Sequence, residues 1–157
     1  MTDKQHIGAI VRLAREKRGL TEDFCAQQCG LTRMEYYDLE AYDDEFFDNI
    51  SMGTARRISL LLGLDLVGLV AKHVEANIAD RSYVDDARFF SRDALVREGR
   101  LKKTMTQADL ADAIGFETMT IQELEHSPDY IECLPIRVVV DVAVALGIDP
   151  GSLVCNR

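Results

Sequence analysis

Few side chains in this sequence of 157 residues have the types and the spacing that chemistry needs. Cys25 and Cys29 are four residues apart, so on a helix they would share one face and could bind a metal or form a redox pair. The acidic run DDEFFD, residues 43–48, could hold a cation, but it lacks the glycine and the ligand spacing of an EF-hand loop. We therefore expect both cysteines in the core and the acidic run in a solvated loop.

The three histidines also stand alone. His6, His73 and His126 have no matching nucleophile and no metal-ligand spacing around them. The sequence therefore predicts a protein that is not an enzyme, with no catalytic residue, no metal ligand, no cofactor and no small-molecule substrate.

The composition is that of an acidic globular protein. Apolar residues make up 47% of the chain, and 18 Lys and Arg stand against 27 Asp and Glu, for a net charge of −9 with no basic tail. The N-terminus lacks the long apolar core of a signal peptide. The most apolar run, residues 58–71, is interrupted by Asp65 and is too short to span a bilayer. We expect a cytoplasmic protein with no membrane partner.

An internal repeat determines the predicted architecture. A shift of 85 residues aligns LAREKRGLTEDFCAQQCGLTRMEYYDLE (13–40) with EGRLKKTMTQADLADAIGFETMTIQELE (98–125). Beyond a loop that is one residue shorter, LGLDLVGLV (62–70) aligns with LGIDPGSLV (146–154). The sequence therefore predicts two copies of one small domain, copy one at 1–75 and copy two at 89–157. The identical pairs of the first alignment are Arg12, Arg15, Lys17, Thr21, Ala26, Gly30, Met34, Leu39 and Glu40 with Arg97, Arg100, Lys102, Thr106, Ala111, Gly115, Met119, Leu124 and Glu125.

Capping residues predict where the helices of each copy begin and end. Thr21 and Thr106 suit the N-cap of a second helix, and Gly30 and Gly115 suit its left-handed end. Thr32 can cap a third helix with Glu35 in the reciprocal position, whereas copy two has the poorer cap Glu117. A fourth helix is expected at about 54–62 and again from Pro135. A last helix is expected after Asp65 and after Asp149, and the fold class is therefore all-α.

The segment between the copies, residues 76–88, contains no Pro or Gly, and we predict a helical linker. Val67, Val70, Val74 and Ile78 could pack on copy two or on another chain. The repeat also bears on the cysteines, because the counterparts of Cys25 and Cys29 are Leu110 and Ile114, two core-type residues.

Copy two resembles the helix-turn-helix domain of Cro-type phage repressors. The similarity lies in the capped helix TQADLADAIG (106–115), in the next helix, which ends in LE, and in the distal LGIDPGSLV (146–154). Copy one, with TEDFCAQQCGLTRMEYYDLE (21–40), resembles the family less closely. The resemblance implies two tandem lambda-repressor-like five-helix domains, the first divergent, in a DNA-binding regulator of transcription.

The resemblance also implies roles for individual residues. Arg15 with Glu40, and Arg100 with Glu125, match the family's structural ion pair between the first and third helices. Gln107 matches a DNA-contacting glutamine, where copy one has Glu22. The base-contacting positions of the third helix are Thr32, Arg33, Met34 and Asp38 in copy one, and Glu117, Thr118, Met119 and Glu123 in copy two. Gln122 could also reach a base if the helix is rotated.

Charge opposes DNA binding. Seven acids and one base lie between residues 32 and 48, and five acids with no Lys or Arg lie between 117 and 136. Like charges repel phosphates, which supply most of the affinity of DNA-binding proteins. The basic clusters on the first helices favour DNA, although they also suit helix C-termini. Glu and Asp can accept from cytosine.

Two functions therefore remain open from the sequence. The first is a transcription regulator that binds duplex DNA chiefly through copy two. The second is an acidic module for protein–protein interaction that binds a repressor, a toxin or a polymerase component. Met34, Met119 and Tyr37 suit such a surface, whereas Phe46 and Phe47 are expected to fold onto the core. One chain could present two recognition helices as a repressor dimer does, and a homodimer is also possible.

Overall fold

The computed structural model describes residues 6–75 and 91–155. Within these ranges the secondary structure is helical, and the exception is one isolated β-bridge between Ser51 and Pro135. The all-α prediction is confirmed for this part of the chain. The predicted helical linker at 76–88, together with Ile78, lies outside the described residues.

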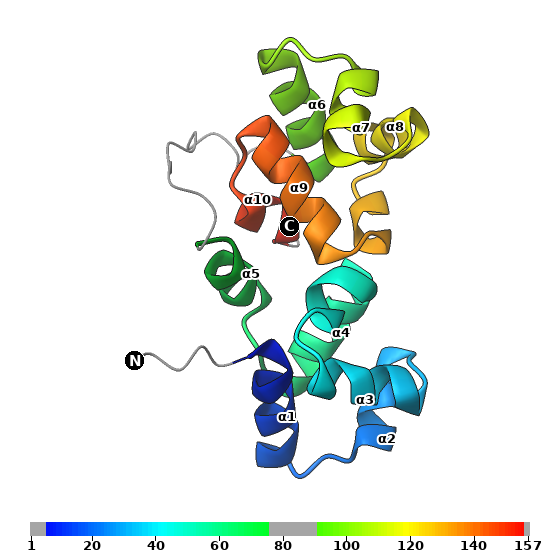
Figure 1. Ribbon diagram of the computed structural model, residues 1–157, viewed down its shortest axis with the longest axis vertical. Coiled ribbons are helices and arrows are strands. Elements are labelled where there is room, and N and C mark those ends of the chain that lie inside the picture. Colours follow the sequence, from blue (N-terminus) through cyan, green and yellow to red (C-terminus); the bar gives the residue numbers. More distant parts are fainter. Residues whose placement is uncertain (1–5, 76–90, 156–157) are drawn as a thin grey trace.

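The helices follow the same order in the two copies (Figure 1). The fourth helices begin where the sequence predicts, within two residues, and Pro135 is the N-cap of its helix rather than a first-turn residue. Copy one contains α1 (Ile7–Lys17), α2 (Glu22–Cys29), α3 (Arg33–Ala41), the π-helical turn η1 (Glu45–Asn49), α4 (Met52–Leu62) and α5 (Leu66–Glu75). Copy two contains α6 (Arg92–Lys102), α7 (Gln107–Ile114), α8 (Thr118–His126), the 3-10 turn η3 (Tyr130–Cys133), α9 (Ile136–Leu146) and α10 (Pro150–Val154).

The caps expected from the sequence are formed. The Thr21 hydroxyl accepts from the Phe24 amide, and Thr106 and Thr32 form capping boxes with Asp109 and Glu35. Glu117 caps α8 without a side-chain hydrogen bond, as expected for the poorer cap. These contacts fix the start of the helices that carry the candidate site.

Left-handed residues recur at equivalent positions of the two copies. Gly30 and Gly115 end α2 and α7 with φ of 71° and 72°. The loop before each of these helices also turns through a positive φ, at Gly19 (65°) in copy one and at Thr104 (54°) in copy two. The backbone path therefore repeats even where copy two has a threonine in a conformation that favours glycine.

The cysteines of α2 belong to the core, as predicted. Cys25 and Cys29 are buried, together with Tyr36 and Leu39 of α3. Burial raises the pKa of both thiols above the ordinary value, which keeps them protonated and unreactive. Among the described residues, no group of three or more metal-binding side chains is placed to hold an ion.

This burial predicts a difference in thiol reactivity. In the native protein a thiol-specific reagent should modify the exposed Cys133 rapidly, whereas Cys25 and Cys29 should react only when the protein unfolds. Mass spectrometry of partly modified protein measures the order. Rapid modification of Cys25 under native conditions would contradict the core placement.

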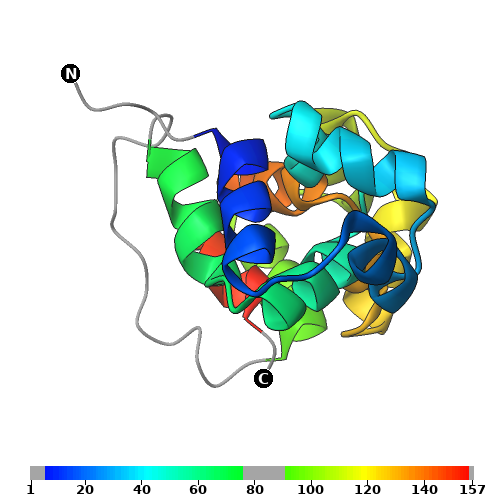
Figure 2. The ribbon, with the colours of Figure 1, turned by 90° about the horizontal axis from the view of Figure 1, so that it is seen from below.

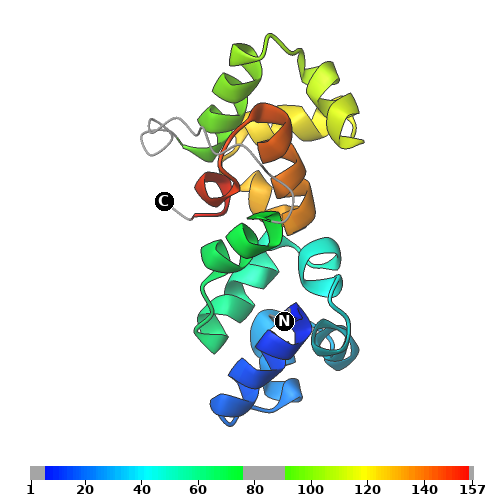
Figure 3. The same ribbon diagram turned by 60° about the vertical axis from the view of Figure 1, so that its left-hand side comes forward.

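Contacts between the two copies join equivalent elements. The bridge between Ser51 and Pro135 is antiparallel, and these residues correspond under the repeat offset of 84. The Met52 amide donates to the Leu134 carbonyl at 2.7 Å. The start of α4 packs on η3, the start of α9 packs on η1, and α5 packs on α10 (Figure 3). Each contact therefore has an equivalent with the copies exchanged, because α4 meets η3 just as α9 meets η1. An interface of this kind has approximate two-fold symmetry.

The valines of α5 are those for which the sequence leaves the packing partner open. Val70 and Val74 are buried, and the Val67 side chain lies against Gly151 of α10. Of the two possibilities that the sequence leaves open, packing on copy two is present for Val67. None of the described helices has the length and the apolar character needed to cross a membrane.

Candidate DNA- and partner-binding surface

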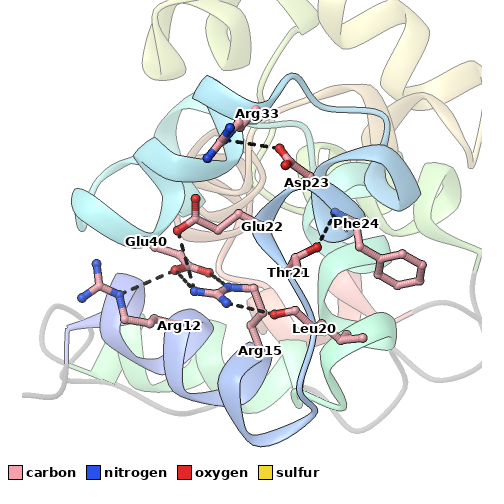
Figure 4. Close-up of polar contacts among 9 residues, drawn as sticks. All are labelled: Arg12, Arg15, Leu20, Thr21, Glu22, Asp23, Phe24, Arg33 and Glu40. Carbon is pink, nitrogen blue, oxygen red and sulfur yellow. Dashed lines mark hydrogen bonds and ion pairs between the residues drawn. The ribbon is translucent and has the colours of Figure 1, made fainter.

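An ion pair holds the third helix of copy one against the first (Figure 4). Arg15 donates from Nε and Nη2 to the two oxygens of Glu40, at 2.6 and 2.9 Å, and from Nη1 to the Leu20 carbonyl at 3.0 Å. The Glu40 side chain is 1% exposed, and Arg12 approaches it to 3.6 Å. The Arg15 guanidinium therefore joins α1, α3 and the loop before α2.

Copy two contains the same arrangement. Arg100 donates to the two oxygens of Glu125 at 2.5 and 2.9 Å and to the Met105 carbonyl at 2.9 Å. Burial raises the pKa of Glu125, but hydrogen bonds from Arg100 and Gln107 outweigh it and leave the pKa below its ordinary value. Both ion pairs implied by the resemblance are thus present, and each fixes the direction in which the outer face of the third helix points.

Gln107 lies at the start of α7, where the resemblance places a DNA contact. Its side-chain amide donates to Glu125 at 2.9 Å, so its carbonyl oxygen and its second N–H remain for another partner. In copy one the corresponding Glu22 lies 3.8 Å from Arg15. The two copies therefore present different groups at this position, a neutral amide and a carboxylate.

The other predicted site residues lie on the outer faces of α3 and α8. Met34 and Met119 are each 67% exposed, the same value in both copies. Thr32, Arg33, Tyr37, Glu117, Gln122 and Glu123 are exposed, whereas Asp38 and Thr118 are half-buried. The helix pairs α2–α3 and α7–α8 lie on the same side of the molecule, on the right in Figures 1 and 2.

Ion pairs change the charge around α8 from the value that residue counting gives. Of the five acids between 117 and 136, Glu125 is paired with Arg100, and Glu132 is paired with Arg56 at 2.8 Å and Arg92 at 2.5 Å. Arg92 also lies 3.7 Å from the exposed Asp129. The two remaining acids are Glu117, the N-cap of α8, and Glu123. Neither has an ion-pair partner among the described residues.

The surface around α3 retains more negative charge. Its basic residue, Arg33, lies 3.3 Å from Asp23, so its charge is already compensated (Figure 4). Arg15 pairs with Glu40, and Arg137 pairs with Asp48 at 3.1 Å. His6 contacts Asp43. In the described part of the chain, the acids of this region without an ion-pair partner are Glu35, Asp38, Asp44 and Glu45.

Aromatic side chains also differ between the copies. Phe46 and Phe47 are buried, as predicted, and Phe47 stacks on His73 of α5. Tyr37 and Tyr42 are 48% and 56% exposed. Their counterparts in copy two are Gln122 and Ser127, so the exposed tyrosines belong to copy one alone.

Sequence reasoning did not find the arginines that neutralise Glu132. Arg56 of α4 crosses from copy one to Glu132 and donates also to the Val154 carbonyl at 2.5 Å. Arg56 and Arg92 correspond to Val140 and Ile7 in the other copy, so the repeat gave no sign of them. Comparison with family models, with curated proteins and with solved structures finds no match to this chain.

Proposed function

We propose that this chain is a transcription-regulatory protein that binds duplex DNA chiefly through α7 and α8 of copy two. In this proposal each copy is a Cro-type, lambda-repressor-like helix-turn-helix domain, and copy one is divergent. The repeated caps, the repeated ion pair and the repeated order of helices support it. The proposal rests on the residues and the geometry of this chain.

The observation that carries the proposal is the compensation of charge around α8. Arg100 neutralises Glu125, and Arg56 and Arg92 together neutralise Glu132. The outer face of α8 then presents Met119 and Gln122 with the two acids Glu117 and Glu123. A glutamine can bond to adenine and a glutamate can accept from cytosine, so this face has groups that read base edges.

The approximate two-fold symmetry gives the proposal a geometry. Repressor dimers use two-fold symmetry to place two recognition helices in successive turns of the major groove, about 34 Å apart. Here α3 and α8 lie on one side of a single chain, so a second chain is not needed to supply the second helix. We expect the protein to bind as a monomer, with a strong half-site for copy two and a weak or absent one for copy one.

Titration of duplex DNA tests the proposal. Random and genomic fragments should bind at about 50 mM salt and release at about 200 mM, because phosphate contacts are salt-dependent. Gln122→Ala should weaken binding to a selected site by about tenfold, the scale of one base contact. Glu117→Thr should strengthen binding, because it removes an acid and installs the cap that copy one has in Thr32.

The copy-one variant Tyr37→Ala is the matched control, because it truncates the equivalent side chain in the weak or absent half-site and should change DNA binding far less than Gln122→Ala does. Absence of binding at low salt on all fragments would remove the proposal. The second candidate, an acidic protein-binding module with little or no DNA binding, would then remain. The observation that favours it is on α3, where Asp23 compensates the charge of Arg33.

A further inference from the structure

The outer face of α3 carries an apolar stripe that nothing in the described structure covers. Met34, Tyr37 and Ala41 follow one another at intervals of three and four residues, the spacing that aligns side chains on one face of a helix. All three are exposed, and Tyr42, the C-cap residue of the helix, is a second exposed tyrosine close by in the chain. Exposed tyrosines bring contact area at a low cost in conformational entropy, which suits a binding surface.

The fold does not require these tyrosines. At the equivalent positions copy two has Gln122, His126 and Ser127 in place of Tyr37, Ala41 and Tyr42, and α8 still forms between the same neighbours. Met34 and Met119 alone are shared. The aromatic character of the stripe is therefore a property of copy one that packing within the chain does not explain.

The charge around the stripe selects the kind of partner. Glu35 and Asp38 lie on the same helix, and Asp44 follows two residues after Tyr42. Hydrogen bonds from Thr32 lower the pKa of Glu35, which keeps that carboxylate ionised. The nearby Arg33 is paired with Asp23. A phosphate backbone would meet repulsion here, whereas a surface rich in Lys and Arg would meet complementary charge.

We propose that the α3 face of copy one is a docking surface for the basic surface of another protein. Tyr37 and Tyr42 would enter an apolar hollow of that partner, Met34 would adapt to its shape, and the surrounding acids would pair with lysines and arginines at the rim. This surface is separate from α7 and α8. The inference therefore does not depend on DNA binding by copy two.

Site-specific photocrosslinking in the full-length protein tests this inference. A benzoylphenylalanine at position 37 keeps an aromatic side chain in the stripe, and the same residue at position 122 is the matched control in copy two. In cells that naturally make the protein, position 37 should crosslink to one protein that mass spectrometry identifies and whose contact region is basic. Position 122 should not give that product.

The affinity of the purified pair then measures the role of the tyrosines. The double variant Tyr37→Gln/Tyr42→Ser, which gives copy one the residues of copy two, should weaken binding at least tenfold while its unfolding curve stays close to wild type. The affinity of the wild-type protein for its partner should also fall as the salt concentration rises, because salt screens the attraction between acidic and basic side chains. A crosslink from position 37 to nucleic acid, to an acidic protein or to nothing overturns the inference, as does an unchanged affinity of the double variant.

Discussion

Glu40→Ala should lower the free energy of unfolding by about 3–5 kcal/mol, the usual cost of removing one partner from a buried ion pair. Glu40 is 1% exposed at its side chain, and its loss would leave the guanidinium of Arg15, itself only 12% exposed, without its carboxylate. The Arg15 side chain also holds the loop before α2 through the Leu20 carbonyl. Urea denaturation, followed by circular dichroism, measures the change.

A double variant separates the cost of an unpaired charge from the value of the pair. Arg15→Met/Glu40→Leu replaces both charges with apolar groups and should recover most of the stability that Glu40→Ala loses. Asp44→Ala, at an exposed position of the same copy, is the control and should change stability by less than about 0.5 kcal/mol. If Glu40→Ala unfolds at the same urea concentration as that control, the ion pair does not hold α1 and α3 together.

The local structure of each copy followed from the sequence because short-range chemistry determines it. A threonine before an apolar stripe, with an acid three residues later, forms a capping box wherever the helix forms, and Thr32 and Thr106 do so. Gly30 and Gly115 take the left-handed conformation that a helix end favours. The repeat then gave the second copy the same boundaries as the first.

Ion pairs between residues that are far apart in the sequence could not be predicted in that way. Counting residues gave five acids around α8, and the structure pairs Glu125 and Glu132 with arginines that lie 25 to 76 positions away in the sequence. Arg56 reaches Glu132 only because the two copies meet at α4 and η3, a contact that no local pattern encodes. The surface charge of a folded chain depends on such pairs, so a count of acids overstates the net negative charge around α8.

The docking of the two copies was the least predictable feature, and it sets how the two third helices would lie relative to each other in the proposed function. The apolar valines of α5 indicated a contact surface without naming its partner. In the structure the copies meet through residues that are equivalent under the repeat, because Ser51 pairs with Pro135 and α5 packs on α10. Two copies locked in this way present α3 and α8 in a fixed relation, and a loose tether would not.

Glu132→Ala should therefore weaken the junction between the copies by about 2–3 kcal/mol. The estimate lies below the value for a fully buried pair because the Glu132 side chain is 23% exposed. Its loss would leave Arg56 and Arg92, 18% and 9% exposed, facing each other's positive charge. Since Arg56 joins α4 to copy two, the midpoint of urea unfolding should fall, and circular dichroism measures the shift.

The equivalent position in copy one supplies the control. Asp48→Ala removes the partner of Arg137, which is 64% exposed, so solvent screening should limit the loss to below about 1 kcal/mol.

The dependence on pH provides a second measure. Burial raises the pKa of Glu132, but the hydrogen bonds from Arg56 and Arg92 outweigh it, and the pKa lies below its ordinary value of 4.5. A group whose pKa is lower in the folded state stabilises the protein fully above its unfolded pKa and loses that contribution as the pH falls through the folded value. The stability difference between wild type and Glu132→Ala should therefore be largest near about pH 7 and shrink steadily below about pH 4.5, and a difference that stays constant down to acid pH would show that Glu132 does not act through its charge.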